Sequence, residues 1–507
     1  MSRTSKSFIN VRISLIFFFV NLILSFLFRR VFIDKLGTEL LGLNTTIVNI
    51  MNLLNLTELG IDSAIAFFLY QPLAENKHDL VNKFISIQSF LYRKVAYVVL
   101  FLSFVVLLFF NNIFAKADID KWIPYATFLV MLFSSILGYF FNYKQIIFIA
   151  NQEEYKVKII IQSCFIMKQL LQIVSIKYFD NGYIYWLFFE VLNAIFISFL
   201  INRKIKKDFL WLHIDCRCVN ISNVNECVIQ RIKQTFIHKM GYLITSQLTT
   251  LVIYLYLSLS IVTIYTNYQI VALGLLSLTA ALFSNIEAGI GNLVSSNFQS
   301  KIQLVFSEIF EVRFFVSSLF SYAFFLFSSL FIELWVGNDF LLSKQTVMLI
   351  SAIVFISLLR DIPNYFLRAY GLVYDIWSSI VEVVLNVLIS LIMGYYWGIT
   401  GILLGTFVSS FFNGLLWKPC FLFAKGLKNR VVDYFILMSK YIFLLVLSLY
   451  ISGFCVKYFL VEYSSSQIDR FLYGLLSLLI FSLFLALGLI LMSNGLKLFV
   501  KRLKSLI

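Results

Sequence analysis

Long apolar runs dominate the chain and are separated by short polar or charged links. We identify about fourteen such runs, and most exceed the roughly 18 residues that indicate a membrane-spanning helix. They lie near residues 8–30, 41–68, 88–111, 122–143, 156–178, 183–202, 236–263, 268–295, 314–335, 346–370, 374–396, 399–424, 435–460 and 469–492. The pattern predicts a polytopic membrane protein.

The runs are typical of helices and not of a β-barrel. Only α-helices and closed barrels satisfy their backbone hydrogen bonds within lipid. The runs are about twice the length of a barrel strand, and their polar residues do not alternate with apolar ones. The composition agrees, since 60% of the residues are hydrophobic, 13% are charged and the mean hydropathy is +0.89. We therefore expect an all-α membrane protein.

The distribution of basic residues predicts an orientation. A net charge of +15 could indicate nucleic-acid binding in a soluble protein, but here the basic residues are divided among many short loops. When Lys and Arg are assigned to alternating loops, roughly 30 fall on the side of the two termini and about 9 on the other side. This bias predicts that both termini are cytoplasmic and that nucleic acid is not a partner.

A short motif repeats within the chain. The letters ELGI at 58–61 align with EAGI at 287–290, an offset of 229 residues. An even number of predicted helices separates the copies, so both halves have the same orientation, as in transporters whose substrate site lies between two parallel repeats. The predicted parts are an N-terminal lobe of helices 1–6 (1–210), a cytoplasmic linker (211–235), a C-terminal lobe of helices 7–12 (236–430), and helices 13 and 14 with a cytoplasmic tail (431–507).

Several charged residues fall inside predicted spans. A charge at mid-bilayer costs roughly 2.5–3.5 kcal/mol on insertion scales, so each is expected to face a partner or a water-filled cavity. They are Arg12, Glu58, Asp62, Lys168, Glu190, Lys239, Glu287, Arg360, Asp361 and Glu382.

Glu58 and Asp62 are expected to share one face of a helix, because they are four residues apart. A bound cation, a proton or a nearby arginine such as Arg12 would relieve their repulsion. Two interpretations follow. The acids form an ion-coupling or gating site, or they belong to a structural ion pair that locks the first two helices together.

Lys168 lies near the centre of the fifth predicted helix and requires an anion there. That anion is either a substrate phosphate or an internal carboxylate such as Glu190. Arg360 is a further candidate for substrate binding, and Pro363 after it predicts a kink. Glu287 and Glu382 lie deep in their predicted spans and are further candidates for ion coupling.

Motifs of catalysis and of metal binding are missing from the sequence. It contains no P-loop, no G-x-S-x-G and no H-E-x-x-H. The predicted outer loops are too short to build a catalytic domain. The cluster of His213, Cys216, Cys218 and Cys227 lacks zinc-ligand spacing, so we expect no metal site. These absences favour a transporter over an enzyme.

Three stretches carry a resemblance to a known family. They are Leu36-Gly37 with Leu41-Gly42-Leu43 followed by Leu59-Gly60-Ile61-Asp62 and Leu69-Tyr70, then IYTNYQIVAL at 264–273, and LWVGNDF at 334–340. Together with the layout of the whole chain, they resemble the polysaccharide-biosynthesis flippases. These are the O-antigen or capsule exporters of the multidrug/oligosaccharidyl-lipid/polysaccharide (MOP) superfamily, with the MATE-like arrangement of two six-helix lobes and two further helices.

The resemblance implies a flippase of the bacterial inner membrane that moves an undecaprenyl-diphosphate-linked oligosaccharide by alternating access. The expected partners are the lipid bilayer and the pathway's polymerase and glycosyltransferases. The cationic cavity would use Lys168, Arg12 and Arg360. Coupling to Na⁺ or H⁺, with no other cofactor, would use Glu58, Asp62, Glu287, Glu190 and Glu382. Two alternatives remain open, a MATE-like drug or metabolite antiporter and a lipid II flippase.

Overall fold

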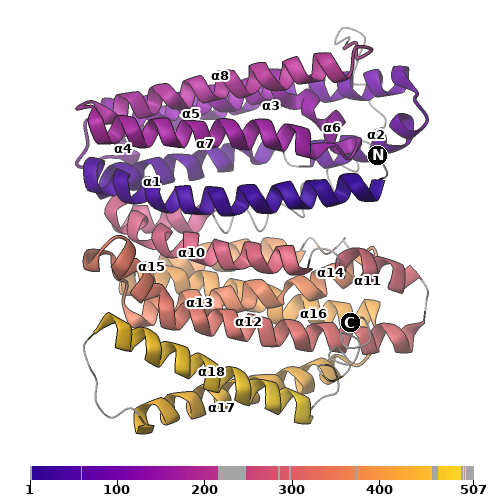
Figure 1. Cartoon of the computed structure of the whole chain (residues 1–507), viewed down its shortest axis with the longest axis vertical. Coiled ribbons are helices and arrows are strands. Elements are labelled where there is room, and N and C mark those ends of the chain that lie inside the picture. The colour runs from indigo at the N-terminus through magenta and orange to yellow at the C-terminus, as the bar shows by residue number, and fades with distance from the viewer. Residues whose placement is uncertain are drawn as a thin grey trace. The chain divides into compact units, whose positions relative to one another are not determined.

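The computed structural model describes residues 3–58, 60–214, 247–283, 286–295, 298–372, 375, 377–459, 466–492, 495 and 497, and every regular element in these ranges is helical (Figure 1). Eleven of the described helices are long and apolar enough to cross a membrane. The prediction of an all-helical polytopic membrane protein is therefore confirmed. The predicted charge Lys239 and the cysteines at 216, 218 and 227 lie outside the described residues.

The chain forms two compact units, unit 1 (Met1–Thr263) and unit 2 (Ile264–Ile507). The helices of unit 1 are α1 (Arg3–Leu54), α2 (Ile61–Ala74), α3 (His78–Leu108), α4 (Phe110–Ile113), α5 (Trp122–Phe141), α6 (Ile146–Ala150), α7 (Glu154–Tyr178), α8 (Gly182–Asp208) and an unlabelled helix Gln247–Tyr256. The long helices α1, α3, α5, α7 and α8 run side by side as a bundle (Figure 1).

Unit 2 begins within α10 and contains a second bundle. Its helices are α10 (Leu259–Phe283), α11 (Ile286–Ser295), α12 (Gln299–Trp335), α13 (Lys344–Leu359), α14 (Asp361–Ala369), α15 (Trp377–Phe411), α16 (Lys418–Phe421), α17 (Val431–Phe459) and α18 (Gln467–Met492). Two π-helical turns, Phe412–Trp417 and Leu422–Gly426, flank α16. Aromatic rings from α12, α14 and α17 fill the core of this unit.

Helix α1 contains a break that divides it into two segments. It has 52 residues, which at 1.5 Å per residue is about 78 Å, more than twice the thickness of a bilayer core. Gly37 interrupts it with φ 83° and ψ 171°, a conformation that a residue with a side chain rarely adopts. The predicted spans 8–30 and 41–68 are therefore joined through this glycine.

The second predicted span is not one continuous helix, contrary to the prediction. It ends at Leu54 and continues as a 3₁₀ turn (Asn55–Glu58), and α2 begins at Ile61 after Gly60, whose φ is 91°. The left-handed glycine redirects the chain between the two acids. Glu58 and Asp62 therefore belong to different elements and do not share a helix face.

Two other predicted boundaries are also wrong. The letters TNYQ at 266–269 were expected to form a link between spans, but they lie inside α10, and the chain turns instead at 257–258, before α10 begins at Leu259. The ninth span was expected to begin near residue 314, but α12 begins at Gln299. The charged residues at 308, 311 and 313 lower the local hydropathy, although they are helical and buried.

Helix α15 folds back on itself as a hairpin that turns at Gly398, where φ is 55°. Polar side chains link its two arms along their length. Ser390 Oγ donates to the Ile402 carbonyl at 2.9 Å, and Asn386 Nδ2 donates to Thr406 Oγ1 at 3.2 Å. The turn lies between the predicted spans 374–396 and 399–424, as the sequence pattern indicates.

We expect Gly401→Ala to destabilise this hairpin. A Cβ atom at Gly401 would lie 1.9 Å from the Met393 carbonyl oxygen, so the arms would have to separate, and overpacking of this kind costs about 1–3 kcal/mol or more. The measurement is the thermal unfolding midpoint of the purified protein. Gly453→Ala is the control, because nothing lies within 4 Å of its added Cβ. Equal midpoints for both variants would contradict close packing of the arms.

Candidate functional site

A small polar pocket of about 260 Å³ lies inside unit 1, beside the break before α2. Glu58 and Asp62 both line it, together with Tyr92 of α3 and Tyr139 of α5. Helix α5 ends at Phe141 and continues as a 3₁₀ turn that contributes Asn142, Tyr143 and Gln145. Two interrupted helices thus place the two acids in one cavity, although they do not share a helix face.

Neutral groups surround the acids. Asp62 Oδ1 accepts hydrogen bonds from Gln88 Nε2 at 2.8 Å and from the Tyr92 hydroxyl at 2.6 Å. The Tyr139 hydroxyl donates to Asn55 Oδ1 at 2.7 Å. None of the described residues that line the pocket is Lys, Arg or His. The local charge of the lining is therefore negative.

Unused acceptor atoms add to this negative character. Asn142 Oδ1 and Gln145 Oε1 are buried and have no hydrogen-bond partner within the described part of the chain, and both residues line the pocket. Two carboxyl groups with amide oxygens beside them form a set of oxygen ligands that favours binding of a cation or a proton.

Lys168 is paired within unit 1. Its Nζ lies 2.8 Å from Glu190 Oε1 and 3.0 Å from Oε2, and Gln172 Nε2 donates to the same carboxylate at 3.1 Å. Helices α7 and α8, which carry the pair, are neighbours along their length. Of the two anions considered for Lys168, the internal carboxylate is the one in contact with it.

Arg12 was one of the groups considered as a partner for the two acids. It is exposed on α1, whereas Asp62 accepts hydrogen bonds from side chains of α3. The structure therefore does not join Arg12 to Asp62.

The predicted charges of unit 2 are joined in pairs. Arg360 Nη1 lies 3.3 Å from Glu382 Oε1, and Asn413 Nδ2 donates to the other oxygen of that carboxylate. Arg368 Nε lies 2.6 Å from Glu287 Oε1, and both side chains are about half exposed. Arg360, Glu382 and Glu287 are thus all bound to a residue of opposite charge.

The sequence prediction missed two buried arginines. Arg313 of α12 is fully buried and binds Asp361. Arg29 of α1 is 8% exposed, and its Nη2 lies 3.4 Å from the Thr263 carbonyl oxygen. Both residues lie at the edges of predicted apolar runs, where a cation is expected to reach water. An analysis of helical periodicity across those edges could have placed them on buried faces.

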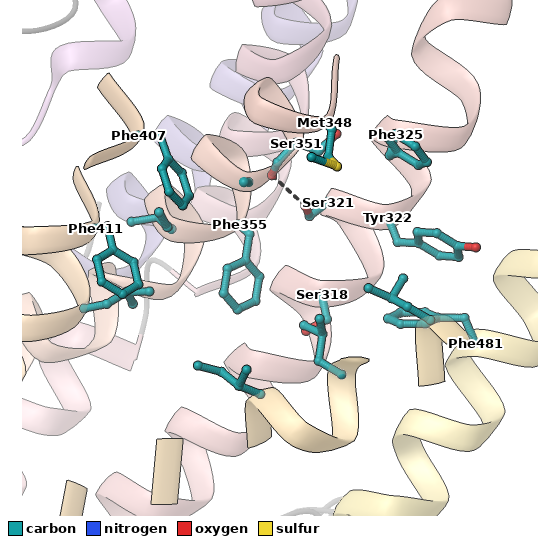
Figure 2. Close-up of a pocket in the computed structure, with 16 residues that line it drawn as sticks. Ser318, Ser321, Tyr322, Phe325, Met348, Ser351, Phe355, Phe407, Phe411 and Phe481 are labelled. Atoms are coloured by element: carbon teal, nitrogen blue, oxygen red, sulfur yellow. Dashed lines mark hydrogen bonds between the residues drawn. The ribbon is translucent and has the colours of Figure 1, made fainter. Parts of the chain in front are cut away.

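Unit 2 contains a larger cavity of about 530 Å³ between α12, α13, α15, α17 and α18 (Figure 2). Phe355, Phe407 and Phe411 line it on one side, and Tyr322 and Phe481 line the other. The serine hydroxyls of the wall are bonded within the protein. Ser318 donates to Phe314, Ser321 to Ser351 and Ser351 to Val347, each to a backbone carbonyl. The cavity therefore presents a hydrocarbon surface.

The chain resembles known proteins in its fold and not in its sequence. No family model and no curated protein matches the chain by sequence. Among solved structures, the lipid II flippase MurJ in an inward closed conformation matches with a TM-score of 0.65 and 13% identity, over 94% of this chain and 98% of that one. An inward-facing multidrug-resistance MATE transporter of the MOP superfamily matches with a TM-score of 0.61 and 12% identity, over 80% of this chain and 95% of that one.

The chain has the fold of the MOP-superfamily transporters. The Vibrio cholerae MATE transporter VcmN, in a mutant form, matches with a TM-score of 0.53 and 14% identity, over 85% of this chain and 99% of that one. A lipid II flippase and multidrug-resistance MATE transporters thus share this fold. At these identities the likeness is one of backbone fold.

Proposed function

We propose that the chain is an ion-coupled flippase that moves an undecaprenyl-diphosphate-linked oligosaccharide across the bacterial inner membrane by alternating access. The observation that carries the coupling is the pocket of Glu58 and Asp62 in a predicted membrane region, where the described lining residues include two carboxyl groups and no basic side chain. A cation or proton bound there would be released and rebound as the transporter changes state.

The topology that we propose has fourteen spans with both termini cytoplasmic. The eleven candidate spans include two long helices that glycines divide, Arg12–Leu54 at Gly37 and Trp377–Gly426 at Gly398. Each is long enough for two crossings. The apolar helix Gln247–Tyr256 would belong to one further span.

The lipid-linked cargo is supported by two observations. The resemblance around Gly60 and Asp62 is to flippases of lipid-linked oligosaccharides. The cavity of unit 2 offers hydrocarbon walls and has its hydroxyl groups already bonded, which suits a polyprenyl chain better than a polar solute. A lipid II flippase is the second candidate, because the fold match to MurJ covers 94% of this chain.

Deletion of the gene tests the cargo. We expect loss of a surface polysaccharide and accumulation of its lipid-linked precursor on the cytoplasmic side, with the cells remaining viable. Lysis with accumulation of lipid II would favour the second candidate. Normal surface glycans combined with increased sensitivity to drugs would contradict both and favour an antiporter. Re-expression of the wild-type chain is the control.

A further inference from the structure

Unit 2 has side chains at positions equivalent to those of the acidic pocket in unit 1. Tyr92 and Arg313 each lie 14 residues after the first residue of their helices, α3 and α12. Asn142 and Asp361 each lie eight residues before the alanine that ends α6 and α14, respectively. A wall of the pocket in unit 1 thus corresponds to Arg313 and Asp361 in unit 2.

The backbone supports this equivalence. After α6, Gln152 has φ 59° and the next residue's N–H bonds the Phe148 carbonyl at 2.8 Å. After α14, Gly371 has φ 69° and the next residue's N–H bonds the Leu367 carbonyl at 2.9 Å. The same helix ending follows both segments.

The neighbouring short helices also correspond. Helix α2 packs against α6 in unit 1, and α11 packs against α14 in unit 2. Each partner helix has an acid in its first turn, Asp62 in α2 and Glu287 in α11. By helix position, the counterpart of Glu287 is therefore Asp62, and not Glu58 as the alignment of ELGI with EAGI predicts.

The two equivalent places differ in charge. Tyr92 is a neutral donor, whereas Arg313 is a guanidinium with no exposed side-chain surface. Arg313 Nη2 lies 2.6 Å from Asp361 Oδ2, its Nε donates to the Leu358 carbonyl at 2.7 Å, and its guanidinium lies 4.5 Å from the centre of the Phe283 ring. The cation is thus held by a carboxylate, a carbonyl and an aromatic face.

The other arginines nearby are already engaged with acids of their own. Arg360 is paired with Glu382 and Arg368 with Glu287. Each of these three arginines is thus paired with one carboxylate, whereas the pocket of unit 1 has two carboxyl groups and no basic side chain among its described lining residues. Removing Arg313 would take away the cation in direct contact with Asp361, and Arg360 and Arg368 would act on that carboxylate only from further away.

We propose that the guanidinium of Arg313 is a permanent cation in unit 2. It occupies the position that corresponds to the site of the exchangeable cation in unit 1. This inference rests on the proposed ion coupling at Glu58 and Asp62. The inference implies that each chain has one ion-coupling site, the pocket of Glu58 and Asp62. It also predicts that unit 2 acquires a cation site when Arg313 is made neutral and Asp361 is kept.

The test counts cations in the full-length chain in lipid nanodiscs. Binding of radiolabelled Na⁺ is measured at mildly alkaline pH, and infrared spectroscopy reports any protonated carboxylic acid. We expect the wild type to bind one cation and Glu58→Gln/Asp62→Asn to bind none. Adding Arg313→Gln to that double variant should restore one cation, as a bound Na⁺ or a new protonated acid. Adding Asp361→Asn as well should remove it again.

Arg313→Lys is the matched control, because it keeps the charge and should restore no cation. Size-exclusion chromatography shows whether each variant is folded. Should Arg313→Gln prevent folding, Arg313→Gln/Asp361→Asn and Arg313→Lys are compared instead, and the inference requires both to fold and to bind no additional cation. A folded Arg313→Gln variant that gains neither Na⁺ nor a protonated acid overturns the inference. A wild-type protein that binds no cation would contradict the proposed coupling site in unit 1. This result is separate from the gain of a cation in unit 2 by the Arg313→Gln variants.

Discussion

Replacing Glu58 by Gln and Asp62 by Asn is expected to abolish concentrative transport while leaving the protein folded. Both acids line the pocket that we propose for the coupling cation, and the neutral amides cannot exchange a charge. One charge moved through 100 mV supplies about 2.3 kcal/mol, which corresponds to a concentration ratio of about fifty-fold. We expect the double variant to lose a driving force of this size.

The measurement is export of the surface glycan at matched expression, followed by ion-driven transport in proteoliposomes. Glu75→Gln is the matched control, because Glu75 pairs with Lys77 at an exposed site outside the pocket. Its transport should equal that of the wild type. Wild-type export by the Glu58→Gln/Asp62→Asn variant would show that the pocket has no part in coupling.

Replacing Lys168 by Met is expected to destabilise the protein because it leaves Glu190 without its counter-charge inside unit 1. Breaking a buried ion pair costs about 3–5 kcal/mol. The Lys168 side chain is 10% exposed and that of Glu190 is 21% exposed, so we expect a cost near the lower end of this range, about 3 kcal/mol. Lys168→Met/Glu190→Met should recover most of the loss, since replacing both charges is often neutral.

The exchange variant Lys168→Glu/Glu190→Lys separates the two predicted roles of Lys168. A structural pair is preserved by the exchange, so both the unfolding midpoint and the export of glycan should remain near wild type. A substrate-binding lysine would be displaced from its place, and export would fall although the protein remained stable. We expect the first result, because both carboxylate oxygens of Glu190 lie within 3.0 Å of Lys168 Nζ.

The two acids of the pocket could be located from the sequence, but the pocket that contains them could not. Their depth within an apolar run marked Glu58 and Asp62 as a candidate coupling site. The sequence pattern predicted an unbroken helix there, because hydropathy carries no information on backbone dihedral angles. Gly60 in the left-handed region placed the two acids on separate elements, and a turn at the end of α5 supplied the opposite wall.

Residue type and run length by themselves determined that this is a helical membrane protein, because lipid excludes any backbone that does not satisfy its own hydrogen bonds. They also marked most of the charges that require a partner. Only the tertiary structure decided which partners these are. Lys168 meets Glu190 and Arg313 meets Asp361 because packing brings separate helices together, and the identity of neighbours across a helix interface is not encoded in the hydropathy of either helix.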